Sequence, residues 1–218
     1  MSEQKVFKDT SGGVVKSVLD NGVTVLVDSA SYCRTVVLGI CFKAGAREEM
    51  AENSGITHLV EHLLFKRTTT KSPKDIAAEI DSLGGEINAL TDPDSCCLFG
   101  LVPCERAGDL MDFFQELLFR NSFVAEDIAI EKDIIRQEIL EAEDDPLDVV
   151  FQKFTEKFWP SSGLALPVCG TLESLEKFTE TDIKSRLREM LCGKRIAIAA
   201  AGNIQAHVVH EFAEQAFG

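Results

Sequence analysis

Two histidines and a glutamate lie within five residues of one another in the segment His58-Leu59-Val60-Glu61-His62. On an α-helix, at roughly 100° per residue, the two histidines lie about 40° apart, and Glu61 lies about 60° to the other side of His58. All three therefore project from one face, while the opposite face is apolar. Burying polar side chains on such a helix costs free energy of folding unless a metal ion or a hydrogen-bonding partner binds them. Two imidazoles and a carboxylate suit zinc, which takes tetrahedral nitrogen and oxygen ligands and leaves a position for water.

A third ligand is predicted on the helix expected at residues 125–143. Glu131 and Glu138 lie about 20° apart on that helix, in the middle of an apolar stripe that includes Ile128 and Ile135. A buried carboxylate normally pairs with a cation or binds a metal. Glu138 is thus the expected third ligand, and Glu131, two turns earlier, is placed to orient a ligand histidine.

Other polar groups have simpler interpretations. The five-residue motif alone arises by chance in roughly one chain in a few hundred, so it is moderately specific. His207 and His210, on the last expected helix, are interpreted as structural or surface groups. The acidic run at 141–148 is interpreted as a solvated face and turn. No serine or cysteine triad is recognisable in the sequence.

The elements that must position these residues mix strand hairpins with helices. Asn21-Gly22 between two β-branched runs is a hairpin signal. Ser72, Pro73 and Gly84-Gly85 mark the start and end of a helix. Further strands are expected at 35–42, 86–91, 97–102 and 195–201, and further helices at 56–65, 105–119, 125–143, 146–158, 180–191 and 205–217. Without regular βαβ alternation, this pattern predicts an α+β fold over residues 1–218, a two-layer sandwich with a mostly antiparallel sheet and helices packed on one face.

Composition narrows the possible partners and the compartment. The net charge of −14 disfavours nucleic acid, and 45% apolar residues indicate a globular chain. The polar N-terminus shows no signal peptide, and no apolar run is long enough to cross a membrane. The seven cysteines are odd in number and contain no Cys-x-x-Cys pair. They are expected to be reduced, buried thiols in a cytoplasmic protein, with no disulfide frame.

At the histidine motif the sequence resembles the pitrilysin-type zinc peptidases, which carry the inverted His-x-x-Glu-His order and include processing peptidases and insulin-degrading enzymes. The similarity extends well beyond the motif and covers nearly the whole chain. The matching segments are 42–49, 55–66, 84–89, 131–138, 167–171 and 201–203.

The resemblance implies a role for each candidate residue. It implies one Zn²⁺ per chain on His58, His62 and Glu138. It also implies Glu61 as the catalytic base and Glu131 as the supporting carboxylate. The strand with Asn88 and Ala89 resembles the family's edge strand, which receives an extended peptide by β-augmentation.

The resemblance also implies a missing component. Family members pair this domain with a similar zinc-less domain that helps to bind substrate, and Tyr32, the one tyrosine here, lies outside any matching motif. We therefore expect a zinc endopeptidase that needs a homologous zinc-less partner half, with a homodimer as another form. One alternative is a zinc-loaded but catalytically incomplete peptide-binding or assembly subunit. Another is a non-peptidase hydrolase with the same metal frame. Glu61 favours a hydrolase, because a scaffold has no use for a base.

Overall fold

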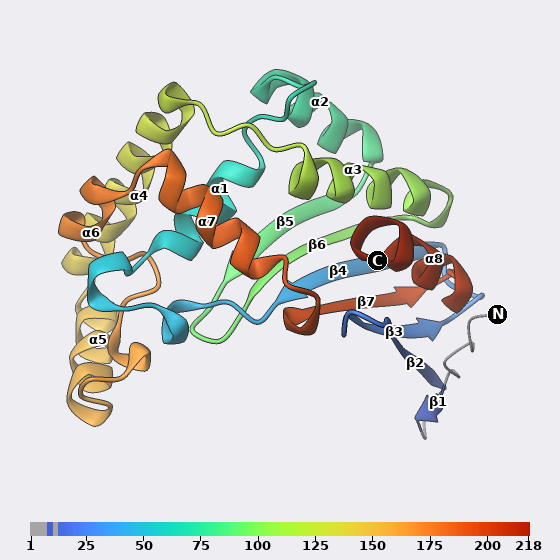
Figure 1. Ribbon diagram of the computed structural model, residues 1–218, viewed down its shortest axis with the longest axis horizontal. Coiled ribbons are helices and arrows are strands. Elements are labelled where there is room, and N and C mark those ends of the chain that lie inside the picture. Colours follow the sequence, from blue (N-terminus) through green and yellow to red (C-terminus); the bar gives the residue numbers. More distant parts are fainter. Residues whose placement is uncertain (1–7, 11–12) are drawn as a thin grey trace.

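A seven-stranded sheet forms the base of the computed structural model, which describes residues 8–10 and 13–218 (Figure 1). Its order is β1-β2-β3-β7-β4-β6-β5. Strands β3 and β7 run parallel, and the other neighbouring pairs are antiparallel, which confirms the predicted, mostly antiparallel sheet. The strands are β1 (Lys8–Thr10), β2 (Val14–Val18), β3 (Thr24–Ser29), β4 (Thr35–Phe42), β5 (Glu86–Thr91), β6 (Cys96–Pro103) and β7 (Ile196–Gly202).

The helices gather on one side of this sheet, as predicted (Figure 1). Along β4, the alternate residues Val36, Leu38 and Ile40 are buried under the helices, whereas Val37, between Val36 and Leu38, is exposed on the other face. The helices are α1 (Ile56–Leu64), α2 (Pro73–Leu83), α3 (Ala107–Phe119), α4 (Ala125–Asp144), α5 (Pro146–Phe158), α6 (Leu172–Lys177), α7 (Glu180–Met190) and α8 (Ala206–Phe217). Among the described residues, no helix is long and apolar enough to span a bilayer.

Two short elements were not expected. The first is β1, which lies in the N-terminal segment and pairs with β2, while residues 1–7 and 11–12 lie outside the described part. Helix α6 has a capping box, in which the Thr171 hydroxyl accepts a hydrogen bond from the Ser174 amide at 3.1 Å. Its six residues are too few to show a helical period, so the cap was the one usable signal.

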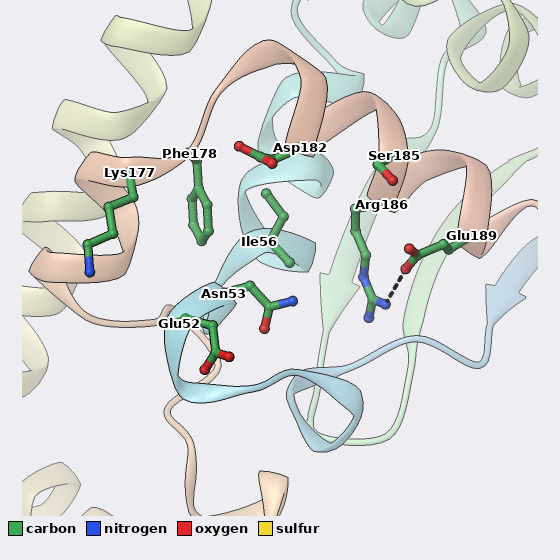
Figure 2. A pocket seen from close by; sticks show the side chains of 9 residues that line it. All are labelled: Glu52, Asn53, Ile56, Lys177, Phe178, Asp182, Ser185, Arg186 and Glu189. Atoms are coloured by element: carbon green, nitrogen blue, oxygen red, sulfur yellow. Dashed lines mark hydrogen bonds and ion pairs between the residues drawn. The ribbon is translucent and has the colours of Figure 1, made fainter.

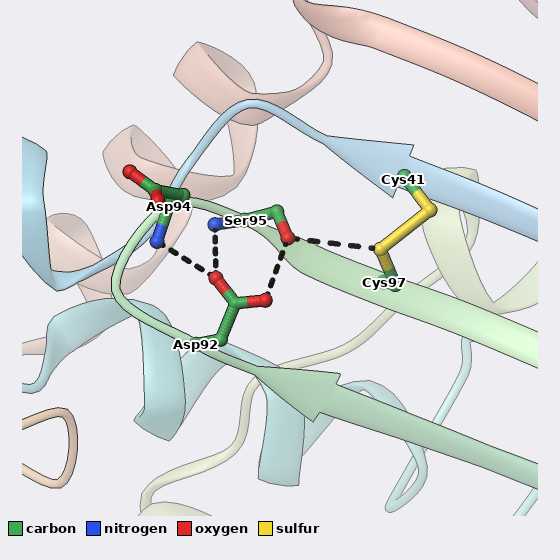
Figure 3. The surroundings of a disulfide bond; sticks show 5 residues. All are labelled: Cys41, Asp92, Asp94, Ser95 and Cys97. Carbon is green, nitrogen blue, oxygen red and sulfur yellow. Dashed lines mark hydrogen bonds between the residues drawn. A yellow bond between two sulfur atoms is a disulfide. The ribbon is translucent and has the colours of Figure 1, made fainter.

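The prediction that all cysteines are thiols is wrong for one pair. Cys41 on β4 and Cys97 on β6 lie directly opposite each other, with Cα atoms 4.1 Å apart, and form a disulfide (Figure 3). The other five cysteines are free. Beside the bond, Asp92 accepts hydrogen bonds from the Asp94 and Ser95 amides, each at 2.7 Å, and so fixes the β5–β6 turn. The pairing follows from strand register, which the spacing of cysteines along the sequence does not reveal.

Candidate metal centre

A buried carboxylate holds the start of α1, the helix that carries the histidines. Gly55 is the N-cap of this helix, in a left-handed conformation with φ 89°. Its lack of a side chain permits this conformation. Glu49, only 6% exposed, supplies the missing acceptor. It accepts hydrogen bonds from the amides of Gly55 and Thr57 at 2.7 and 2.9 Å, and from the Thr57 hydroxyl at 2.6 Å. The helix is thereby fixed one residue before His58.

The three predicted ligands converge on one point. The Nε2 atoms of His58 and His62 lie 3.2 Å apart. The carboxylate of Glu138 lies 3.8 Å from the first and 3.7 Å from the second. All three ligand atoms lie within 4.8 Å of one another. Ligand atoms about 2.0–2.1 Å from a tetrahedral zinc ion are separated by roughly 3.3 Å, so the arrangement fits such an ion.

The protonation of the histidines also suits a metal. Burial, together with the nearby His62, lowers the pKa of His58 to about 4, so this imidazole is neutral at neutral pH. Burial also lowers the pKa of His62. The hydrogen bond to Glu131 and the charges of Glu138, Glu131 and Glu61 outweigh that effect, so the net shift is upward. A neutral imidazole is a ligand, and a proton on His62 competes directly with a metal ion.

Glu131 orients His62 from behind. The carboxylate is 1% exposed, lies 3.1 Å from Nδ1 of His62, and accepts a hydrogen bond from the Lys66 ammonium at 2.9 Å. Burial raises the pKa of Glu131. The hydrogen bonds from His62 and Lys66, together with the charges of these two groups, lower the pKa by more than burial raises it, so the net shift is downward. With Nδ1 engaged, the Nε2 of His62 is left for the metal. The sequence analysis missed Lys66, which lies four residues after His62, just past the C-terminal end of α1.

Glu61 projects into the same space without joining the three ligands. Its carboxylate accepts a hydrogen bond from the Thr91 hydroxyl on β5. Burial raises the pKa of Glu61, and this effect exceeds the lowering by Thr91 and His62. A carboxylate with a raised pKa is a stronger base. Thr91 was not predicted. The sequence pattern that could have indicated Thr91 is the alternation along β5, which buries Ala89 and Thr91 on the face beneath α1.

The candidate substrate strand lies at the sheet edge beside α1. β5 is the last strand in the sheet order and contacts α1. Ala89 is buried and Asn88 is exposed on the helix-free face. The Asn88 side chain accepts a hydrogen bond from the Ala89 amide at 2.8 Å. A peptide strand added at this edge would accept the hydrogen bond of the Ala89 amide in place of the Asn88 side chain. Without such a strand, Asn88 satisfies this amide at the open edge.

The remaining polar candidates lie elsewhere. His210 contacts the Ser17 hydroxyl at 2.9 Å and Glu214 at 3.3 Å, and His207 is exposed on α8. Both lie away from α1 and α4, in agreement with their interpretation as structural or surface groups. The acidic run at 141–148 ends α4 and begins α5 with largely exposed side chains.

An α+β frame that gathers two imidazoles and one carboxylate at one point, with a further carboxylate beside them, offers the ligand types that a zinc ion takes. The chain belongs to the insulinase family of peptidases, peptidase family M16, whose family model matches residues 24–172. This match confirms the resemblance drawn from the sequence motifs. It also covers His58, Glu61, His62 and Glu138.

Named relatives agree with this family. An uncharacterized zinc protease of Bacillus subtilis is 31% identical over 198 residues, which cover 91% of this chain and 48% of the relative. An uncharacterized zinc protease of Rickettsia felis is 31% identical over 201 residues, covering 92% and 49%. The chain therefore spans about half the length of these relatives.

Solved structures share the fold. A protease from Helicobacter pylori superposes with a TM-score of 0.87 at 20% identity, over 94% of this chain and 50% of that one. A peptidase M16 inactive domain from Pseudomonas fluorescens also gives 0.87, at 17% identity, with the same coverage. At these identities the likeness concerns the fold alone.

Proposed function

We propose that the chain is the metal-binding half of a zinc endopeptidase, with one Zn²⁺ on His58, His62 and Glu138 and with Glu61 as the catalytic base. The observation that carries this proposal is the 3.2 Å approach of the two imidazole Nε2 atoms, with the Glu138 carboxylate 3.7–3.8 Å from both. Two imidazole nitrogens this close, beside a carboxylate, are placed where a cation could bind all three groups.

The residues of the chain divide the chemistry among them. When bound, zinc polarises the scissile carbonyl and acidifies a water molecule. Glu61 takes the proton of the attacking water and delivers it to the leaving amine. Thr91 holds that carboxylate on the substrate side, next to β5. Glu131 keeps His62 in the orientation and tautomer that a ligand requires.

The substrates proposed are extended peptides or leader segments. The open edge of β5 can hydrogen-bond only to a backbone that is itself extended, and a folded protein rarely offers one. Asn88 and Ala89 would bind that backbone, with the Asn88 side chain giving up the Ala89 amide. The peptide would then run beside α1, where Glu61 and the two histidines project.

A second, zinc-less half of the same fold is the proposed partner. The relatives are about twice as long as this chain, and one similar structure is titled the first half of the periplasmic protease PqqL from Escherichia coli. In this chain alone the Glu138 side chain is 40% exposed and the β5 edge is open. Water would compete there for every substrate hydrogen bond, and a covering half would exclude it.

A catalytically incomplete peptide-binding or assembly subunit is the second candidate. It draws on the similar structure titled an inactive M16 domain. The presence of Glu61 with its Thr91 hydrogen bond supports the peptidase over this candidate, because binding alone needs no base.

Metal analysis combined with a cleavage assay tests the proposal. The purified chain should hold about one zinc, and His62→Ala and Glu138→Ala should each lose it. His210→Ala is the matched control, because this histidine also contacts a glutamate but lies on α8. Full zinc retention in either ligand variant would disprove the site. Cleavage of a quenched peptide should be weak for the chain alone and rise with the zinc-less half of a relative, and rapid cleavage by the isolated monomer would contradict the need for a partner.

A further inference from the structure

Helix α7 carries a buried arginine, Arg186, that the proposed zinc chemistry does not use. The side chain is 7% exposed. Its Nε donates a hydrogen bond to the Thr57 hydroxyl at 2.9 Å. Its Nη1 donates one to the Glu189 carboxylate at 3.3 Å, and both of these side chains extend from α7 (Figure 2). Within the described part of the chain, Nη2 is buried without a hydrogen-bond partner. An unsatisfied buried donor costs free energy of folding, so this arginine calls for an explanation.

Stability alone does not explain Arg186. Taking a guanidinium out of water is costly, and replacing buried ionic groups with apolar side chains of similar volume is often neutral or stabilising. The arginine also lines a cavity of about 310 Å³ between α1 and α7, together with Ile56 and Phe178 (Figure 2). Apolar packing between the two helices is incomplete at this cavity. The hydrogen bond from Arg186 to Thr57 therefore makes the connection that apolar side chains do not make here.

Thr57 links Arg186 to the first turn of α1. Its buried hydroxyl accepts the hydrogen bond from Arg186 and donates one to the Glu49 carboxylate at 2.6 Å. Hydrogen bonds with an ionised partner are roughly twice as strong as those between neutral groups, and both partners of this hydroxyl are ionisable. The same Glu49 caps the helix by accepting from two backbone amides. The start of α1 is thus held by α7 on one side and by the preceding segment on the other.

The orientation set at Thr57 reaches the candidate metal ligands through the helix itself. His58 is the next residue, and Glu61 lies one turn further on, on the same side of the helix as Thr57. A rotation of about 10° around the helix axis moves groups that lie about 5–6 Å from the axis by about 1 Å. A functional site tolerates displacements of only about 0.5 Å. Because Glu138 is on a different helix, a small rotation of α1 would separate the histidines from it.

We propose that Arg186 is a positioning residue of the zinc site, which holds α1 through Thr57 in the orientation that directs both histidines toward Glu138. This inference rests on the proposed function, because the site that Arg186 supports is the proposed zinc site. Arg186 lies on α7 and acts on the ligands only through α1. A helix that is already held in the binding orientation loses less conformational freedom when the metal binds, so the affinity for zinc is higher.

Zinc and cobalt titrations of the whole chain test this inference. Arg186→Gln should weaken zinc binding by about tenfold, the lower end of the range for residues that orient ligands. It should also change the visible absorption of the cobalt-loaded chain, which depends on ligand geometry. Thr57→Val, which replaces the hydroxyl with a methyl group, should have a similar effect. The double variant should bind zinc about as well as either single variant, because both substitutions break one hydrogen bond. Arg186→Lys keeps the charge and a donor, and it should recover part of the affinity.

Arg188→Gln is the matched control, because Arg188 is exposed on the same helix and this variant should bind both metals as the wild type does. Hydrogen exchange of the metal-free chain gives a second readout. The amides of α1 should exchange faster in Arg186→Gln than in the wild type. If Arg186→Gln does not fold, Thr57→Val and Arg186→Lys provide the same comparison.

Two results would overturn the inference. One is a lower urea midpoint in Arg186→Gln with unchanged zinc affinity and cobalt spectrum, which would make Arg186 a purely structural residue. The other is full additivity of Arg186→Gln and Thr57→Val, which would show that the arginine does not act through Thr57. A wild-type chain that binds no zinc would instead refute the proposed function, and hydrogen exchange would still show whether Arg186 holds α1.

Discussion

Replacing Glu131 with glutamine should weaken zinc binding by about tenfold to hundredfold and leave the chain folded. The carboxylate is 1% exposed, and its two oxygens are held by Nδ1 of His62 at 3.1 Å and by the Lys66 ammonium at 2.9 Å. Glutamine has nearly the same shape and can still accept a hydrogen bond from His62. The substitution therefore removes a charge without opening a cavity.

The magnitude follows from these contacts. A hydrogen bond to an ionised group contributes about 1.5–3 kcal/mol, and one between neutral groups about 0.5–1.5 kcal/mol, so about 1–1.5 kcal/mol is lost at the His62 contact. The attraction between the carboxylate and a dication on the far side of the imidazole is lost as well. Together these losses correspond to about one to two powers of ten in affinity. Lys66 retains its charge but is 35% exposed, so water can solvate it.

Competition with a chromophoric chelator measures the effect. Glu141→Gln is the control, because Glu141 lies on the same helix with an exposed side chain and should leave the zinc affinity unchanged. Glu138→Gln should cost more than Glu131→Gln, since it removes a ligand atom and not the support of one. Unchanged affinity in Glu131→Gln, with an unchanged circular dichroism spectrum, would show that His62 is held by other contacts and would refute this account.

Three further predictions concern helix α1 and the carboxylate that caps it. Glu61→Gln should keep its zinc and reduce turnover in any active assembly by several orders of magnitude, and metal loss in this variant would contradict its role as base. Zinc affinity should rise by about tenfold per pH unit while His62 is protonated and level off once the pH exceeds its raised pKa. His58, with a pKa of about 4, should add a second step only in acid, and calorimetry in buffers of different ionisation enthalpy can count the protons released. Glu49→Gln should lower the free energy of unfolding by about 1–3 kcal/mol, because a neutral amide cannot replace a carboxylate that accepts three hydrogen bonds, and urea titration against Glu52→Gln as an exposed control would measure it.

The sequence predicted those parts of the site that follow from local periodicity. The spacing of His58 and His62 sets their shared face on a helix, and the position of Glu138 within an apolar stripe directs it inward. Both depend only on the geometry of single helices. The α+β class was likewise readable from the mixture of hairpins and helices, and the structure confirms it.

The contacts that the sequence did not predict depend on register or on distant segments. Glu49 caps α1 from six to eight residues upstream, across a loop whose path no periodicity describes. Thr91 reaches Glu61 because β5 lies beneath α1. Cys41 and Cys97 meet because β4 and β6 align at that pair, although 56 residues separate them. Each of these contacts is a consequence of tertiary packing.

The position of β7 determines the order in which the protein can fold. This strand is formed from residues 196–202, yet it lies in the sheet between β3 and β4, which are formed from residues 24–42. During synthesis every candidate metal ligand emerges from the ribosome while β3 and β4 still lack their common neighbour. Such unpaired strands are prone to aggregate, and pairings between residues so distant in sequence form slowly. A nascent chain that stops before residue 196 should therefore depend on chaperones and bind zinc poorly, even though it already carries both histidines and Glu138.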